Sequence, residues 1–111
     1  MLKIEKNVLV VQDVGLCLAI IVAHECFYRY GYTCRITSMR DGAHSERSYH
    51  YLDSAVDCGL RDVAPRHHIK ITEEIKLNLP DYYDVVYEGD HIHIELDLKK
   101  FKEAENALLG R

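Results

Sequence analysis

The chain has 111 residues, of which 48% are hydrophobic and 29% charged, with a formal net charge of −4 and a pI near 5.9. This length predicts one domain, over residues 1–111, and the composition is too apolar for a disordered chain. The acidic balance argues against a nucleic-acid-binding protein that works by neutralising phosphates. The cysteines lack C-x-x-C spacing, and we expect them to be reduced and to pack as small hydrophobic residues: Cys17, Cys26, Cys34 and Cys58.

No targeting or membrane-spanning segment is visible in the sequence. Residues 1–6 lack the apolar centre of a signal peptide, and the apolar run in residues 14–23 is too short to cross a bilayer. We therefore expect a protein that is made in the cytoplasm, with reduced thiols and no membrane partner.

The first part of the chain predicts a strand, a long helix and a second strand. Residues 8–11 form a short apolar run that suits a strand or the lead into a helix. Asp13 can cap a helix over residues 14–30, in which apolar residues recur at helical spacing and which Gly31 would end. The β-branched residues of 34–38 predict a strand.

The rest of the chain completes a mixed pattern of helices and strands. Residues 39–47 are polar and suit a loop that lines a site. A second helix is predicted over residues 66–79. Two strands are predicted over 84–88 and 91–98, joined by a tight turn or bulge, and a helical tail follows over 104–109. This order predicts an α+β fold, with a small antiparallel sheet packed with two helices.

Two short stretches carry most of the reactive side chains. Residues 48–57 contain S-x-H-x-x-x-x-A-V-D, and residues 88–93 read E-x-x-H-I-H. Together His50, Asp57 and His93 offer two imidazoles and one carboxylate. Three protein ligands with an open fourth position are typical of a catalytic zinc site.

The spacing within these stretches bears on whether the side chains can meet. His91 and His93 are two apart on a predicted strand, so both side chains point to the same face. His50 and Asp57 are seven apart and would lie on opposite faces of a continuous strand, but the polar turn over residues 52–54 can fold both toward one point. Spacing alone leaves the ligand set open.

With His44-Ser45 before them, these stretches resemble the zinc peptidases that cleave D-alanyl-D-alanine or L-alanyl-D-glutamate links in peptidoglycan. The likeness extends over residues 35–95. It is closest to the short phage-type members and to the signalling domain of hedgehog, which shares their fold. In this family S-x-H-x-x-G-x-A-x-D supplies a His and an Asp ligand, and a later H-x-H supplies the third.

The resemblance implies a hedgehog/DD-peptidase-like fold in which His50, Asp57 and His93 bind Zn²⁺. Ser48 matches a supporting position and is assigned to substrate binding. Asp53 stands where the family has Gly, and Asp tolerates a left-handed turn at a cost of about 1 kcal/mol.

The resemblance also assigns the proton transfers. A carboxylate must take a proton from water and pass it to the leaving amine, and the candidates are Glu88 and Asp90. Glu88 corresponds to the acidic residue of the phage-type and hedgehog sequences, whereas Asp90 has the D-x-x-H spacing of related endolysins or is a turn residue. We favour Glu88. His44 and His91 are expected to stabilise the developing oxyanion or to orient the water.

Two further residues have expected roles around this site. Arg40 follows the T-S strand, where the family places a substrate-binding Arg, and a guanidinium would pair bidentately with a carboxylate of the stem peptide. Glu95 is expected to be solvated or hydrogen-bonded beside the ligands.

The sequence therefore predicts a zinc-dependent metallopeptidase that hydrolyses D-amino-acid-containing bonds of peptidoglycan stem peptides. It would be a D-Ala-D-Ala carboxypeptidase or an L-Ala-D-Glu endopeptidase that acts on the cell wall. We expect it to be encoded by a phage or associated with a virion. The alternative is a zinc-binding interaction domain of the same fold without catalysis, since hedgehog keeps the same constellation. Glu88 discriminates between them, because a structural site needs no general base.

Overall fold

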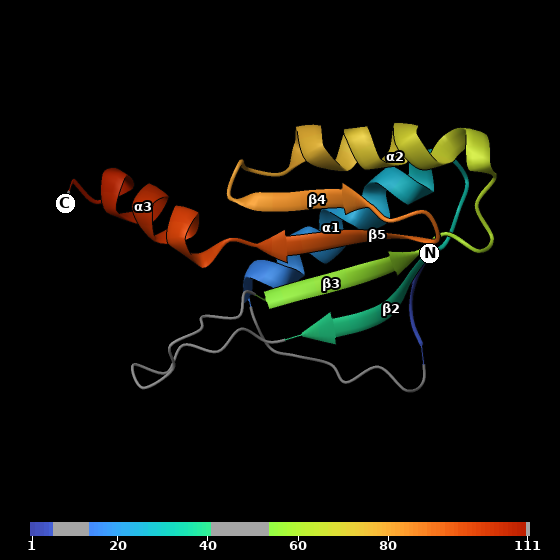
Figure 1. Cartoon of the computed structure of the whole chain (residues 1–111), viewed down its shortest axis with the longest axis horizontal. Helices are drawn as coiled ribbons and strands as arrows, with labels where there is room; N and C mark the ends of the chain where they lie inside the picture. Colours follow the sequence, from blue (N-terminus) through green and yellow to red (C-terminus); the bar gives the residue numbers. More distant parts are fainter. Residues whose placement is uncertain (6–13, 41–53, 111) are drawn as a thin grey trace.

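The computed structural model describes residues 1–5, 14–40 and 54–110, and these form an α+β fold around one sheet (Figure 1). The strands lie in the order β1-β2-β3-β5-β4. The pair β1 and β2 is parallel and all other neighbours are antiparallel, so the sheet is mixed. The strands are β1 (Leu2–Ile4), β2 (Cys34–Arg40), β3 (Ser54–Gly59), β4 (Tyr83–Tyr87) and β5 (His91–Leu96).

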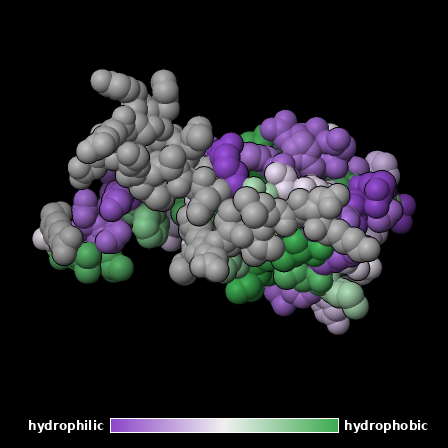
Figure 2. Space-filling view, turned by 90° about the horizontal axis from the view of Figure 1, so that it is seen from below, coloured by the Kyte–Doolittle hydropathy of each residue, from purple (hydrophilic) through white to green (hydrophobic). Residues whose placement is uncertain are grey.

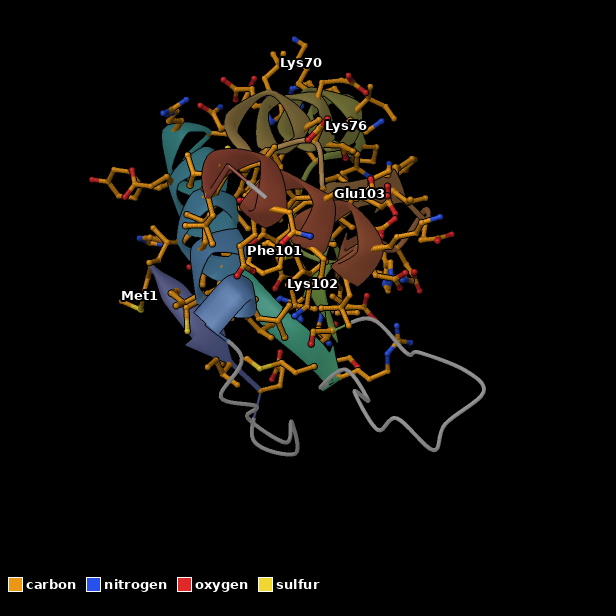
Figure 3. All side chains as sticks on the ribbon, turned by 90° about the vertical axis from the view of Figure 1, so that its left-hand side faces the viewer. Met1, Lys70, Lys76, Phe101, Lys102 and Glu103 are labelled. Carbon is orange, nitrogen blue, oxygen red and sulfur yellow. The ribbon has the colours of Figure 1, made fainter. Side chains whose placement is uncertain are left out.

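The described helices leave one face of the sheet uncovered. Helix α1 (Val14–Arg29) lies behind the sheet in the view of Figure 1, and helix α2 (Pro65–Asn78) runs above β4 and packs against both β4 and α1. Helix α3 (Leu98–Leu108) extends beyond the end of the sheet and has no buried residue; it stands in front in Figure 3. We call the sheet face without a described helix the open face. None of these helices is long and apolar enough to cross a membrane.

Helix α1 contacts the sheet through an apolar stripe. Leu16, Ala19, Ala23 and Phe27 recur at helical spacing and are essentially inaccessible to solvent. Gly31 follows the helix with a φ of 83°, the left-handed conformation that commonly ends helices. Figure 2, the view from below, shows hydrophobic residues gathered in a patch with hydrophilic residues around it.

Helix α2 begins where Pro65 occupies its first turn. The residue before it, Ala64, has no side chain that can cap the helix, and the Tyr32 hydroxyl does so from the loop after α1. This oxygen accepts a hydrogen bond from the Ala64 N–H at 3.3 Å and lies 2.7 Å from His67 Nδ1, within hydrogen-bond distance. The start of α2 is thereby fixed to the loop after α1.

Alternation along β5 separates the core from the open face. Ile92, Ile94 and Leu96 are buried against the helices, whereas the residues between them are partly exposed. On β3, Val56 and Cys58 join the same core. Because side chains alternate between the faces of a strand, the polar residues of both strands gather on the open face.

The structure confirms the predicted fold class and the main local elements. The first helix ends at Arg29 rather than at residue 30, and the hairpin forms with Gly89 at a φ of 91° in its tight turn. The strand predicted over 8–11 and the loop over 41–47 lie outside the described residues.

Three expectations are corrected. The sheet is not purely antiparallel, because β1 pairs parallel with β2. Helix α3 begins at Leu98 and not at residue 104, since the Asp97 carboxylate accepts a hydrogen bond from the Lys100 N–H at 3.1 Å and caps it. Cys17 is exposed, whereas the other three cysteines are buried as expected.

Candidate metal centre

Strand register aligns polar side chains of β3 and β5 on the open face. Asp57 lies directly opposite His93, and the small residues Gly59 and Ala55 lie opposite His91 and Glu95. The two residues that were predicted as ligands on different strands are therefore direct cross-strand neighbours.

His93 lies between two carboxylates. Its Nδ1 is 2.7 Å from Asp57 Oδ1, and its Nε2 is 3.1 Å from Glu95 Oε1. Glu95 Oε1 in turn accepts a hydrogen bond from Arg40 Nη2 at 2.9 Å. Partial burial lowers the pKa of His93, but its hydrogen bonds and its attraction to Glu95 and Asp57 raise it more, so the net pKa lies above the ordinary value. Both ring nitrogens of His93 thus face carboxylate oxygens.

A second histidine approaches Asp57 from the other side. His91 Nδ1 is 2.6 Å from Asp90 Oδ1, and its Nε2 is 3.9 Å from Asp57 Oδ1. The Asp90 side chain is 90% exposed, compared with 24% for that of Asp57. The hydrogen bond with His91 lowers the pKa of Asp90. Asp90 thus orients His91 from the solvent side.

The candidate base Glu88 follows β4 in the hairpin turn. Its backbone N–H donates to the His91 carbonyl oxygen at 2.9 Å, so the two residues are paired across the turn. Glu88 is exposed, as is Asp90. Both residues that are candidates for the general base therefore lie next to His91, at the start of β5.

The described residues form two hollows that share His93. One, of about 140 Å³, lies beside Asp57 where β2 and β3 are neighbours. The other is a more open groove of about 470 Å³ along the edge strand β4. The first is lined by Ser38, Arg40, Ala55, Val56, Asp57 and His93. The second is lined by Lys76, Tyr83, Asp84, Val85, Val86, His93 and Glu95.

The Asp57–His93 pair fits a zinc ion chemically. Carboxylate oxygen and imidazole nitrogen are both common zinc ligands, and two ligands of a tetrahedral site lie about 3.3 Å apart. The observed 2.7 Å would have to open by about 0.6 Å to reach that separation. Within residues 1–5, 14–40 and 54–110, no group of three or more His, Cys, Asp or Glu side chains could hold a metal ion.

Three predicted site residues, His44, Ser48 and His50, lie outside the described residues. Arg40 is the last residue of β2 rather than part of a loop. For Glu95, the sequence analysis expected a position beside the ligands but did not identify its contacts with His93 and Arg40. Its place two residues after His93 continues the alternation H-x-H-x-E, and this was the available signal that it shares the open face.

Comparisons of the chain with protein-family models, with curated proteins and with solved structures gave no match. The likeness to zinc peptidases thus depends on the motif residues alone.

Proposed function

We propose that this protein is a zinc-dependent metallopeptidase that hydrolyses D-amino-acid-containing peptide bonds of bacterial peptidoglycan stem peptides. The observation that supports the proposal most is the contact of 2.7 Å between Asp57 and His93. These residues are 36 positions apart, and each was assigned as a ligand from a separate sequence motif. His50 is the third ligand in this proposal, and the fold is the hedgehog/DD-peptidase type.

When bound by three protein ligands, zinc supplies a Lewis acid for the scissile carbonyl and lowers the pKa of water to about 7. In the proposal Glu88 accepts the proton of the attacking water and transfers it to the leaving amine. His91 donates a hydrogen bond to the carbonyl oxygen as negative charge develops there. Asp90 holds the His91 ring in place through its contact of 2.6 Å. His44 would act with His91, and Ser48 would contact the substrate.

The groove along the edge strand is the place we assign to the stem peptide. It shares His93 with the smaller hollow, so a peptide lying in it would pass beside the proposed centre. A short mixed polar and apolar groove suits a short peptide better than a large apolar ligand.

A second candidate function is a zinc-binding interaction domain without catalysis. It is favoured by the exposure of the hairpin turn, since an efficient general base works best where water is excluded. Asp90 is almost fully exposed, and Glu88 is exposed as well. A chain of this kind would keep the metal but would not need Glu88.

Incubation of the zinc-loaded protein with purified peptidoglycan tests the proposal, with new peptide termini identified by mass spectrometry. We expect new termini that disappear with a chelator and in the Glu88→Gln variant. Their chemistry will show whether a D-Ala-D-Ala or an L-Ala-D-Glu bond is cleaved. A protein that carries zinc but produces no new termini would support the interaction domain. Activity on the wall would also suit a phage-encoded or virion-associated protein.

A further inference from the structure

We propose that Glu95, held by Arg40, is a positioning residue that fixes the His93 imidazole with its Nδ1 toward Asp57. This inference rests on the proposed zinc site and concerns how the chain prepares one of its ligands. It is carried by three contacts in series. They join Arg40 Nη2 to Glu95 Oε1 at 2.9 Å, Glu95 Oε1 to His93 Nε2 at 3.1 Å, and His93 Nδ1 to Asp57 Oδ1 at 2.7 Å.

The sheet register brings Arg40 and Glu95 together across an intervening strand. Arg40 pairs with Ala55 on β3, and Ala55 pairs with Glu95 on β5. The outer strands of three lie about 10 Å apart, a distance that a long Arg side chain can cross only over a small residue. Ala55 is that residue, and it is 4% exposed. A bulky side chain at this position would lie in the path of the guanidinium.

The contact of Glu95 selects one tautomer of a metal-binding His93. A ligating imidazole must be neutral, so one ring nitrogen binds the metal and the other keeps its hydrogen. A carboxylate has no hydrogen to donate and can only accept, so the hydrogen that remains on the ring lies on Nε2. The lone pair then lies on Nδ1, the nitrogen that faces Asp57. Such carboxylate–histidine pairs orient metal ligands and raise their basicity.

Arg40 acts through Glu95 in this arrangement. Its side chain is 44% exposed and that of Glu95 is 28% exposed, so water screens the pair. Partly exposed ion pairs contribute little to stability by themselves. We therefore expect Arg40 to restrict the Glu95 carboxylate, with a smaller effect on metal affinity than that of Glu95 itself.

Zinc affinity, measured by chelator competition on the full chain, tests this role. Glu95→Ala should bind zinc about 10- to 100-fold more weakly than the parent, the usual range for losing such a partner. Glu95→Gln should restore most of the affinity, because the amide oxygen still accepts the Nε2–H. Arg40→Ala should weaken binding only a few-fold. Asp84→Asn is the matched control, because Asp84 pairs with Glu95 across β4 and β5 and should keep the parent's affinity.

The visible absorption of the Co²⁺-loaded protein gives a second readout of how the ligands are arranged. We expect a changed spectrum for Glu95→Ala and a parent-like one for Glu95→Gln and Asp84→Asn. If the parent binds zinc but Glu95→Ala keeps both its affinity and its spectrum, the role of Glu95 is wrong and the proposed metal site stands. If the parent binds neither metal, both proposals fall. Circular dichroism identifies a misfolded Glu95→Ala. In that case the zinc affinity of Glu95→Gln is compared with that of Asp84→Asn. Zinc binding that is 10-fold weaker in Glu95→Gln alone would contradict the expected rescue by the amide oxygen.

Discussion

Asp57 and His93 occupy directly opposed positions on β3 and β5, with the carboxylate Oδ1 2.7 Å from the imidazole Nδ1. This pairing depends on strand register. A slip by one residue would turn His93 toward the core and bring Ile92 or Ile94 to the open face. Since these isoleucines are completely buried, the hydrophobic core itself fixes the geometry of the polar pair.

The general base can be identified by two amide substitutions. Glu88→Gln should retain zinc and fold but lose peptidoglycan hydrolysis by roughly 100-fold or more, the scale of a lost proton transfer. Asp90→Asn should have a smaller effect, because the amide oxygen can still hold His91 through the contact of 2.6 Å. Rates of release of new termini, measured at equal zinc content, compare the two. An inactive Asp90→Asn beside an active Glu88→Gln would reverse the assignment.

Arg40 provides a prediction about kinetics. If it acts through Glu95, Arg40→Ala should lower kcat or zinc content and leave KM for a stem peptide nearly unchanged. If it contacts a substrate carboxylate, as its sequence position suggested, KM should rise while zinc content stays constant. Steady-state kinetics on a synthetic stem peptide separate these outcomes. We expect the first, because the guanidinium already bonds Glu95 at 2.9 Å.

Gly59 is expected to resist substitution because of Arg35. A Cβ at position 59 would lie 2.8 Å from Arg35 Nη2 and 3.0 Å from Thr37 Cγ2. The Arg35 side chain cannot move aside freely, since it is 9% exposed and bonds Glu5 at 3.0 Å and Asp62 at 3.4 Å. Gly59→Ala should therefore cost about 1–3 kcal/mol of unfolding free energy.

Urea denaturation measures this cost, and a double-mutant cycle gives the control. In an Arg35→Ala background the same glycine substitution should cost clearly less, because the crowded guanidinium is absent. Equal costs in both backgrounds would show that Arg35 is not the obstacle.

His67 predicts how stability changes with pH. Burial lowers the pKa of His67, and the positive charges of Arg66 and Lys70 lower it further. The unfolded chain, with an ordinary pKa of about 6.5, therefore takes up the proton first as the pH falls. This contribution to stability is complete above that value and is lost as the pH falls through the lower pKa of the folded state.

The His67→Gln variant isolates this effect. Its unfolding free energy should fall less than that of the parent between pH 8 and pH 5, and denaturation at several pH values measures the difference. An NMR titration should place the parent's His67 below the ordinary histidine value. Identical pH profiles for the two proteins would contradict the assignment.

Local sequence patterns predicted the elements whose signals are local. Apolar spacing defined α1, and the alternation of His91, Ile92 and His93 assigned the imidazoles to one face. Strand β1 was missed because its three residues, Leu2–Ile4, are too few for the period-two pattern of a strand to be recognised. Its parallel pairing with β2 also joins segments about thirty positions apart, as in the pairing of Leu2 with Cys34, which no local pattern encodes.

The contacts of the site were less accessible to sequence reasoning. The approach of Asp57 to His93 was expected only through the family resemblance, and its geometry follows from the pairing of β3 with β5. The contact between Arg40 and Glu95 spans 55 positions and depends on the small Ala55 between them. Such a relationship follows from the register of three strands and cannot be read from one segment.

Elemental analysis of the zinc-replete protein is the direct test of the proposed metal centre. We predict about one zinc per chain in the parent and its loss in His93→Ala and His50→Ala, with thermal stability rising on zinc addition only in the parent. The Asp84→Asn variant should retain the metal, since its carboxylate is on the same face without being an expected ligand. The absence of stoichiometric zinc from the folded parent protein would contradict the proposed metal site.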